Sequence, residues 1–139
     1  MNPVASIDYR ETELWGRAKA VLVETYRLTA GWPEDGKGLA EDIRSAVRLI
    51  VRSVPGAFKK GGITGNVHLQ MAQPHFAELE AMMEAAEALS FVAAGHFAPL
   101  AELLAPVEAE LRELAQASRE HARELRQRSR FDPFGDDED

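Results

Sequence analysis

Apolar residues recur every three or four positions along most of the chain, which is the spacing of one buried face on an α-helix. Glycine- and proline-containing breaks divide this pattern into four stretches. No stretch alternates apolar and polar residues over the length of a strand, so the pattern predicts no sheet. We therefore expect four helices that share one core.

The first helix is predicted at about residues 8–29. Asp8 and Glu11 can form a capping box at its start, and the turn around Gly31 ends it. Trp32 lies in that turn, where it can cap the bundle end or contact a neighbouring subunit, and capping is the favoured role. The apolar stripe of this helix comprises Leu14, Trp15, Ala18, Val21, Leu22, Thr25 and Leu28.

The second helix is predicted at about residues 39–58, with Pro55 near its end. Its inward positions are Leu39, Ile43, Ala46, Val47, Ile50, Val51 and Val54. Residues 59–66 contain two lysines and three glycines, so we expect a hinge there. Asn66 is the candidate N-cap of the next helix.

The third helix is predicted at about residues 67–92, with a bend at Pro74. Its core stripe comprises Leu69, Ala72, Phe76, Leu79, Met83, Ala86 and Leu89. After a break at Gly95, the fourth helix is expected to bend at Pro106. Its apolar positions are Phe97, Leu100, Leu103, Leu104, Val107, Leu111, Leu114 and Leu125.

Four helices with short connections predict an all-α, up-down-up-down antiparallel four-helix bundle in a single domain. After an N-terminal segment at residues 1–7, the bundle is expected to occupy residues 8–130. Its last turns, residues 118–130, are almost wholly charged and are expected to project or fray. Residues 131–139 are an acidic tail that we expect to be disordered.

The amino-acid composition argues against several classes of function. The net charge of −7 argues against a generally basic nucleic-acid-binding surface but allows a local basic patch. The absence of cysteine excludes disulfides and thiolate chemistry. No signal peptide is recognisable, and no apolar run approaches the roughly 20 residues that cross a bilayer, so we expect a cytoplasmic protein without a membrane partner.

Basic side chains gather in the second helix and the hinge. Residues 37–60 hold six basic and two acidic side chains, and three of the arginines lie four residues apart on one helix face. Guanidinium groups in line can bind phosphates or carboxylates, although a solvated helix face is the simpler explanation. The candidate surface for a partner or nucleic acid comprises Arg44, Arg48, Arg52, Lys59 and Lys60.

Acidic side chains gather in the second half of the chain. Residues 78–113 hold eight glutamates and one arginine. A basic face and an acidic face suit head-to-tail association of copies, which closes into a ring when the rotation permits. Alternatively, the basic and acidic rows face each other within one chain. The candidates for an oligomer interface are Glu80, Glu84, Glu87 and Trp32.

No catalytic constellation or cofactor motif is recognisable. His75 precedes Glu78, and His121 precedes Glu124, by three residues each. Di-iron bundles use the opposite order, Glu-x-x-His, with further inward glutamates, so we expect no metal site. The serines lack a Gly-x-Ser-x-Gly elbow, and the glycines of the hinge lack the Gly-Lys-Ser/Thr end of a P-loop. We therefore expect no enzyme and no cofactor.

Several short motifs between about residues 12 and 115 resemble a known family. They are Leu14-Trp15-x-x-Ala18, Tyr26-Arg27-Leu28-Thr29, Trp32-Pro33, Gly38-Leu39-x-x-x-Ile43-Arg44-x-Ala46, Leu69-x-x-Ala72 and Ala77-Glu78-Leu79-Glu80. Together they resemble the four-helix-bundle family named for the 23S rRNA intervening sequence. The second helix is also similar to that of the related accessory variability determinant proteins of diversity-generating retroelements.

The resemblance implies a bundle that assembles into a homopentameric ring. For the retroelement branch it implies binding of nucleic acid and a reverse transcriptase, and for the intervening-sequence branch an association with RNA. Two functional hypotheses follow. The first is a non-enzymatic, ring-forming scaffold for a protein or ribonucleoprotein partner, and the second is a nucleic-acid-binding accessory protein.

Overall fold

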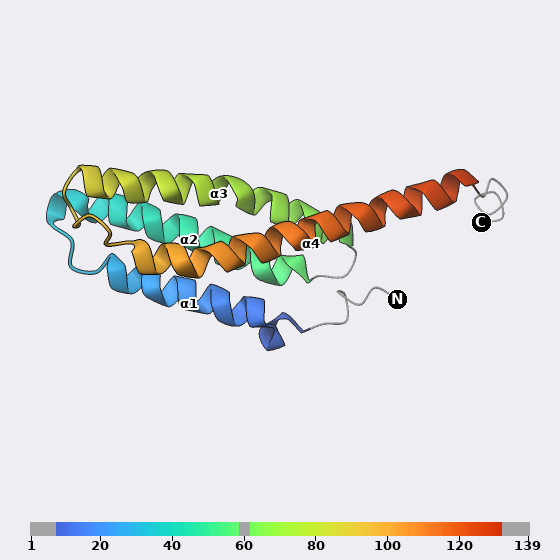
Figure 1. Ribbon diagram of the computed structural model, residues 1–139, viewed down its shortest axis with the longest axis horizontal. Coiled ribbons are helices and arrows are strands. Elements are labelled where there is room, and N and C mark those ends of the chain that lie inside the picture. The colour runs from blue at the N-terminus through green and yellow to red at the C-terminus, as the bar shows by residue number, and fades with distance from the viewer. Residues whose placement is uncertain (1–7, 59–61, 132–139) are drawn as a thin grey trace.

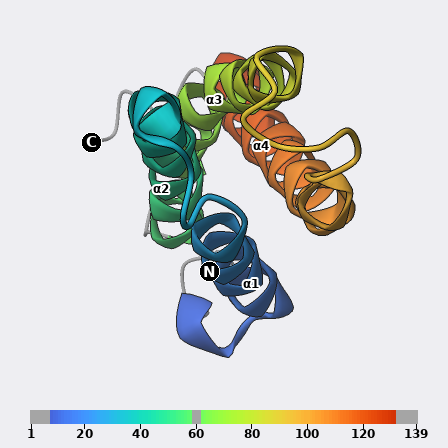
Figure 2. The same cartoon turned by 90° about the vertical axis from the view of Figure 1, so that its left-hand side faces the viewer.

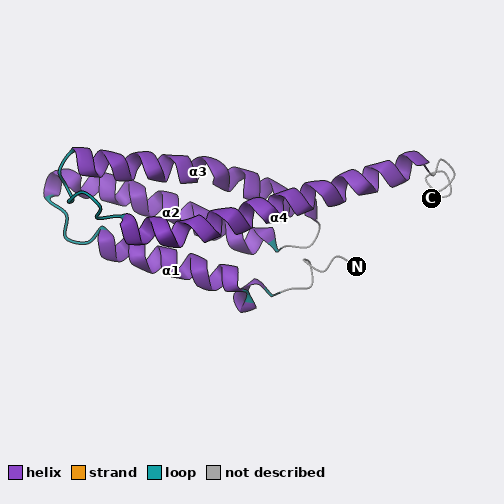
Figure 3. Cartoon of the chain, viewed as in Figure 1, coloured by secondary structure: helices purple, strands orange, loops and turns teal. Residues whose placement is uncertain are grey.

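The computed structural model describes residues 8–58 and 62–131, and for residues 62–69 and 130–131 it describes the backbone alone. Four α-helices follow one another: α1 (Glu13–Leu28), α2 (Lys37–Ala57), α3 (Gly62–Ala88) and α4 (Ala98–Phe131). Short 3-10 helices precede α1 (Tyr9–Glu11) and α2 (Glu34–Gly36). The described residues contain no strand (Figure 3). The prediction of an all-α bundle is confirmed.

The four helices run alternately up and down and enclose one core (Figure 1). α1 and α3 each pack against α2 and α4, as the end-on view shows (Figure 2). None of the helices, within the part of the chain that the structure describes, has the length and hydrophobicity needed to cross a membrane.

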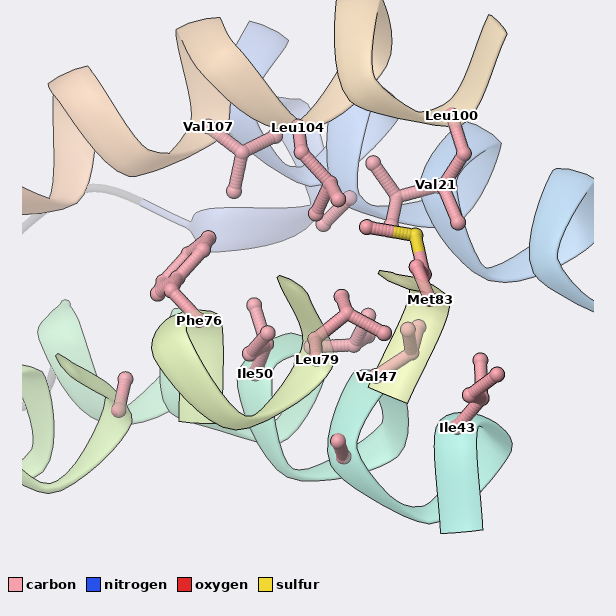
Figure 4. Close-up of a cluster of buried hydrophobic side chains, with 14 of the residues drawn as sticks. Val21, Ile43, Val47, Ile50, Phe76, Leu79, Met83, Leu100, Leu104 and Val107 are labelled. Carbon is pink, nitrogen blue, oxygen red and sulfur yellow. The ribbon is translucent and has the colours of Figure 1, made fainter. Parts of the chain in front are cut away.

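The core follows the predicted stripes closely. Figure 4 shows inward side chains from all four helices meeting along the bundle axis. The largest apolar side chains that are almost fully buried are Leu14, Ile43, Ile50, Leu79, Leu100 and Leu111. Burying one leucine or isoleucine contributes about 1.5–3 kcal/mol, so this shared stripe accounts for the association of the helices.

The chain enters α1 through two separate caps. Asp8 caps the first 3-10 turn, where its carboxylate accepts a hydrogen bond from the Arg10 amide at 3.0 Å. Thr12 caps α1 itself, since its Oγ1 accepts a hydrogen bond from the Trp15 amide at 3.2 Å. The prediction of a single helix that starts at Asp8 with a capping box is therefore wrong. A 3-10 turn comes first, and α1 begins only after it, at Glu13.

The connection from α2 to α3 is shorter than predicted. α3 begins at Gly62, so Asn66 lies inside the helix and is not its N-cap. The rest of the predicted hinge, residues 59–61, lies outside the described residues. Pro55 is accommodated in the last turn of α2, and Pro74 and Pro106 lie inside α3 and α4.

α3 ends four residues earlier than the predicted Val92, and Leu89 is not a core residue. Ser90 adopts the left-handed conformation (φ 60°), and the Phe91 amide donates to the Ala86 carbonyl at 3.0 Å. This is the six-to-one hydrogen bond of a Schellman cap, with serine in the place usually taken by glycine. Leu89 is consequently 60% exposed, whereas Phe91 packs against the core.

α4 continues well beyond the end of the bundle (Figure 1). Its 34 residues correspond to about 50 Å of helix. Ala115 is the last residue of α4 in the buried core, and Leu125, predicted as a core position, is 47% exposed. We call residues 116–131 the α4 extension. The charged last turns project from the bundle as one helix (Figure 1), and this helix includes Phe131, which was predicted to belong to the tail.

Candidate interaction surfaces

The first two arginines of the predicted basic row hold α2 against α1. The Arg44 guanidinium lies over the Tyr26 ring, 4.4 Å from its centroid, and Arg44 Nε donates to Thr29 Oγ1 at 2.7 Å. Arg48 Nη1 donates to the Tyr26 hydroxyl at 2.7 Å, and Arg48 Nη2 pairs with Glu41 at 2.7 Å. The hydrogen bond that Arg48 donates to Glu41, and then the one that it donates to Tyr26, raises the pKa of Arg48 above its usual range. Tyr26 thus engages two of the three arginines.

Arg52 differs from the other two. It is exposed and, within the described residues, makes no hydrogen bond or ion pair. It borders a shallow hollow of about 150 Å³ between α2 and α3, whose other walls include Leu49, Met71 and His75. Lys59 and Lys60 lie outside the described residues. Among the described residues, Arg44, Arg48 and Arg52 therefore do not form one free surface.

The hollow beside Arg52 contains residue types found in hydrolase triads. Ser53 and His75 both line it, and His75 Nδ1 lies 3.3 Å from Glu78. The Ser53 hydroxyl, however, donates to the Ile50 carbonyl of its own helix at 2.6 Å. No hydrogen bond joins Ser53 to His75 among the described residues, so the geometry lacks the nucleophile–base contact that a triad requires.

Metal ligation finds little support in the arrangement of these side chains. His75 contacts Glu78, while His121 and Glu124 lie exposed on the α4 extension. Over residues 8–58 and 62–131, no three histidine, aspartate or glutamate side chains converge closely enough to hold a metal ion.

The three predicted acidic residues of α3 have different roles. Glu87 Oε1 accepts a hydrogen bond from the Gly95 amide at 3.2 Å, so it fixes the α3–α4 connection. Glu80 and Glu84 are exposed and have no hydrogen-bond or ion-pair partner in the described part of the chain. Neither pairs with Arg44, Arg48 or Arg52. Among the described residues, the arginine row of α2 and the glutamate row of α3 therefore do not neutralise each other within one chain.

Glu80 stands on the wall of an open groove between α3 and α4, with a volume of about 420 Å³. Glu108 of α4 also lines this groove and is paired with Arg112, one turn further along its helix, at 3.4 Å. The apolar side chains that line the groove include Phe76, Met83 and Leu104, which are 8–9% exposed. Three alanines, Ala77, Ala101 and Ala105, leave it open to the surface. We call this the α3–α4 groove.

Trp32 belongs to the core at one end of the bundle and is only 7% exposed. Its Nε1 donates to the Leu28 carbonyl at 2.9 Å, and its ring lies 6.1–6.2 Å from those of Phe91 and Phe97. His96 Nε2 lies 2.7 Å from the same carbonyl, which only accepts, so that nitrogen donates as well. The capping role is confirmed, and as an interface candidate Trp32 offers almost no surface to another subunit.

Sequence reasoning recognised the α4 extension as charged but overlooked its sign. Residues 116–129 contain four arginines and two glutamates. The arginines, Arg119, Arg123, Arg126 and Arg128, are exposed and form no ion pair among the described residues. Counting charge by segment, rather than for the whole acidic chain, would have revealed a basic stretch directly after an acidic one.

The chain matches no protein-family model, no curated protein and no solved structure. The resemblance to the intervening-sequence family consequently stays a prediction.

Proposed function

We propose that this protein is a non-enzymatic, self-assembling helical bundle that serves as a scaffold for a protein or ribonucleoprotein partner. The observation that carries the proposal is the separation of charge along α4. Exposed glutamates face outward from α3 and the first half of α4. α4 then continues past the bundle end (Figure 1), and residues 116–129 of this part carry four arginines and two glutamates. Surfaces of opposite charge that remain apart in one chain favour contact between chains.

A head-to-tail contact of this kind is heterologous, so it generates a ring if the rotation closes and a filament if it does not. The family resemblance favours a closed ring, with five copies. Buried side chains of the bundle maintain the fold of each subunit, which leaves the outer surfaces available for assembly and partner binding.

The side chains that line the hollows support a non-enzymatic role. In the α3–α4 groove the polar lining residues are Gln73, Glu80 and Glu108, without a nucleophile or histidine beside them. In the hollow by Arg52, the Ser53 hydroxyl is engaged by its own helix. A surface with an apolar floor and charged walls is better suited to binding than to group transfer.

The mass of the native protein in solution tests the proposal. Sedimentation velocity should give a discrete species with a mass of several times the 15.3 kDa of one chain. A species of 15.3 kDa at every concentration would contradict self-assembly.

Nucleic-acid binding, including a role beside a reverse transcriptase, is the second candidate. It is favoured by Arg119, Arg123 and Arg126, which lie on one exposed helix face at the i, i+4 and i+7 positions. Phosphate contacts by three arginines should weaken binding steeply as salt rises, with a slope of about −2 to −3 in log K against log salt. Absence of RNA or DNA binding at about 50 mM salt, where such contacts are strong, would eliminate this candidate.

A further inference from the structure

The stripe of α4 that faces the core continues along the α4 extension after the bundle has ended. Its positions follow a seven-residue repeat with alternating steps of four and three: Leu111, Ala115, Ser118, Ala122, Leu125 and Ser129. Leu111 and Ala115 are buried in the core, whereas Leu125 is 47% exposed. The extension therefore continues the face that packs against helices inside the bundle, and on this face Leu125 is about half exposed.

Basic residues flank this stripe on both sides. In the seven-residue repeat, Arg119 and Arg126 occupy one edge, and His121 and Arg128 occupy the other. Both edges are exposed, and none of the four side chains forms an ion pair among the described residues. The glutamates of the extension, Glu120 and Glu124, lie outside these edge positions.

Two extensions are therefore poor partners for each other. In a parallel pair the opposite edges of two helices meet, and in an antiparallel pair the same edges meet. Because both edges are basic, arginine faces arginine or histidine in either orientation, and like charges across such a seam oppose association. The stripe requires a partner with an apolar centre and acidic sides.

The α3–α4 groove has this complementary chemistry. Glu80 of α3 and Glu108 of α4 stand on its two helices, and Phe76, Met83 and Leu104 are the large apolar side chains that line it. The alanines at its margin allow the backbone of another helix to approach closely.

We infer that the α4 extension of one copy lies in the α3–α4 groove of the next copy, with Leu125 on the apolar floor and Arg126 and Arg128, one from each edge, against the glutamates of the two walls. This inference specifies the interface of the self-assembly proposed above and rests on it. The extension cannot occupy the groove of its own chain, because both belong to the same continuous helix and the extension leads away from the bundle (Figure 1). The contact is therefore intermolecular and has a direction.

Reversing the charges on each side tests this pairing. The groove variant Glu80→Arg/Glu108→Arg and the extension variant Arg126→Glu/Arg128→Glu should each weaken self-association by about 100-fold or more, since attraction becomes repulsion at two positions. The chain that carries all four substitutions should regain the mass of the native assembly. Asp35→Arg/Asp42→Arg, which makes the same charge change at exposed positions away from the groove, is the matched control and should retain that mass.

The outcomes separate the interface from the proposed function. A wild-type protein that sediments as a monomer would overturn both. A wild-type oligomer that survives either reversal, or a four-fold variant that stays monomeric while its circular dichroism shows a folded helical protein, would overturn the interface alone. The interface is supported if each charge reversal abolishes the oligomer and the chain with all four substitutions forms it again.

Discussion

Replacing Arg44 with alanine should destabilise the monomer, because this arginine joins two helices and is only partly available as a binding residue. Its Nε donates to Thr29, a residue that is 3% exposed, and its guanidinium stacks on the Tyr26 ring at 4.4 Å. Alanine removes both of these contacts between α1 and α2, together with the 3.4 Å hydrogen bond from Arg44 Nη2 to the Tyr26 carbonyl.

The size of the effect can be worked out from these two contacts. A hydrogen bond from a charged group contributes about 1.5–3 kcal/mol, towards the lower end for a half-exposed side chain. A cation–π contact at a partly exposed site adds about 0.5–1 kcal/mol. Together they predict a loss of about 2 kcal/mol in the free energy of unfolding and a fall of roughly 8 °C in Tm for a chain of this size.

Urea unfolding followed by circular dichroism measures this loss. Arg52→Ala is the matched control, since Arg52 lies on the same helix without a partner in the described residues, and it should change the free energy of unfolding by less than about 0.5 kcal/mol. A double-mutant cycle with Tyr26→Leu should show a coupling of about 1 kcal/mol with Arg44. Equal stabilities for the Arg44 and Arg52 variants would refute the reasoning.

Three further predictions concern the cap, the extension and the surface charges. Trp32→Ala should lower the free energy of unfolding by about 3–5 kcal/mol, because the ring is buried in the aromatic cap. A thermal melt that shows a loss of less than about 1 kcal/mol would contradict the capping role. Leu111→Ala should lower the free energy of unfolding in urea by about 3 kcal/mol, whereas Leu125→Ala should leave that of the monomer almost unchanged. Similar losses in the two variants would contradict the position of the extension outside the core. The hydrogen bond from Arg27 holds the pKa of Glu24 below its usual value, so the stabilisation is present above the ordinary carboxyl pKa and is lost as pH falls through the lowered one. In Arg27→Gln, an NMR titration should find this pKa raised towards the usual value, and an unchanged pKa would contradict the assignment of its cause.

The fold could be predicted because the pattern that forms each helix lies in residues close together in the sequence. Apolar residues every three or four positions identify the inward faces, and all four helices were found in their predicted places with shifts at their ends. The errors at Leu89 and Leu125 share a cause: periodicity shows which face of a helix is apolar, but it does not show where the neighbouring helices stop. At Ser90 the helix ends without the glycine that usually marks such a cap.

The candidate surfaces were harder to predict because they depend on tertiary neighbours. Arg44 and Arg48 form a regular row in the sequence, and only the position of Tyr26 on α1 reveals that they are engaged. Glu87 likewise looked equivalent to Glu80 until the Gly95 amide was placed beside it. The groove itself is formed by two helices from separate stretches of the chain, so no local motif marks it.

The central claim is that the α4 extension of one copy contacts the α3–α4 groove of another. Pairwise cross-linking tests this contact most directly. The chain contains no cysteine, so single cysteines can be introduced at exposed positions without background: Leu125→Cys in the extension, Ala105→Cys in the groove, and Ala20→Cys on α1 as the control. When chains with the extension cysteine and chains with the groove cysteine are mixed and mildly oxidised, a disulfide-linked pair of twice 15.3 kDa should accumulate. The mixture of extension and α1 cysteines should yield little of that pair, and equal yields from the two mixtures would contradict the account.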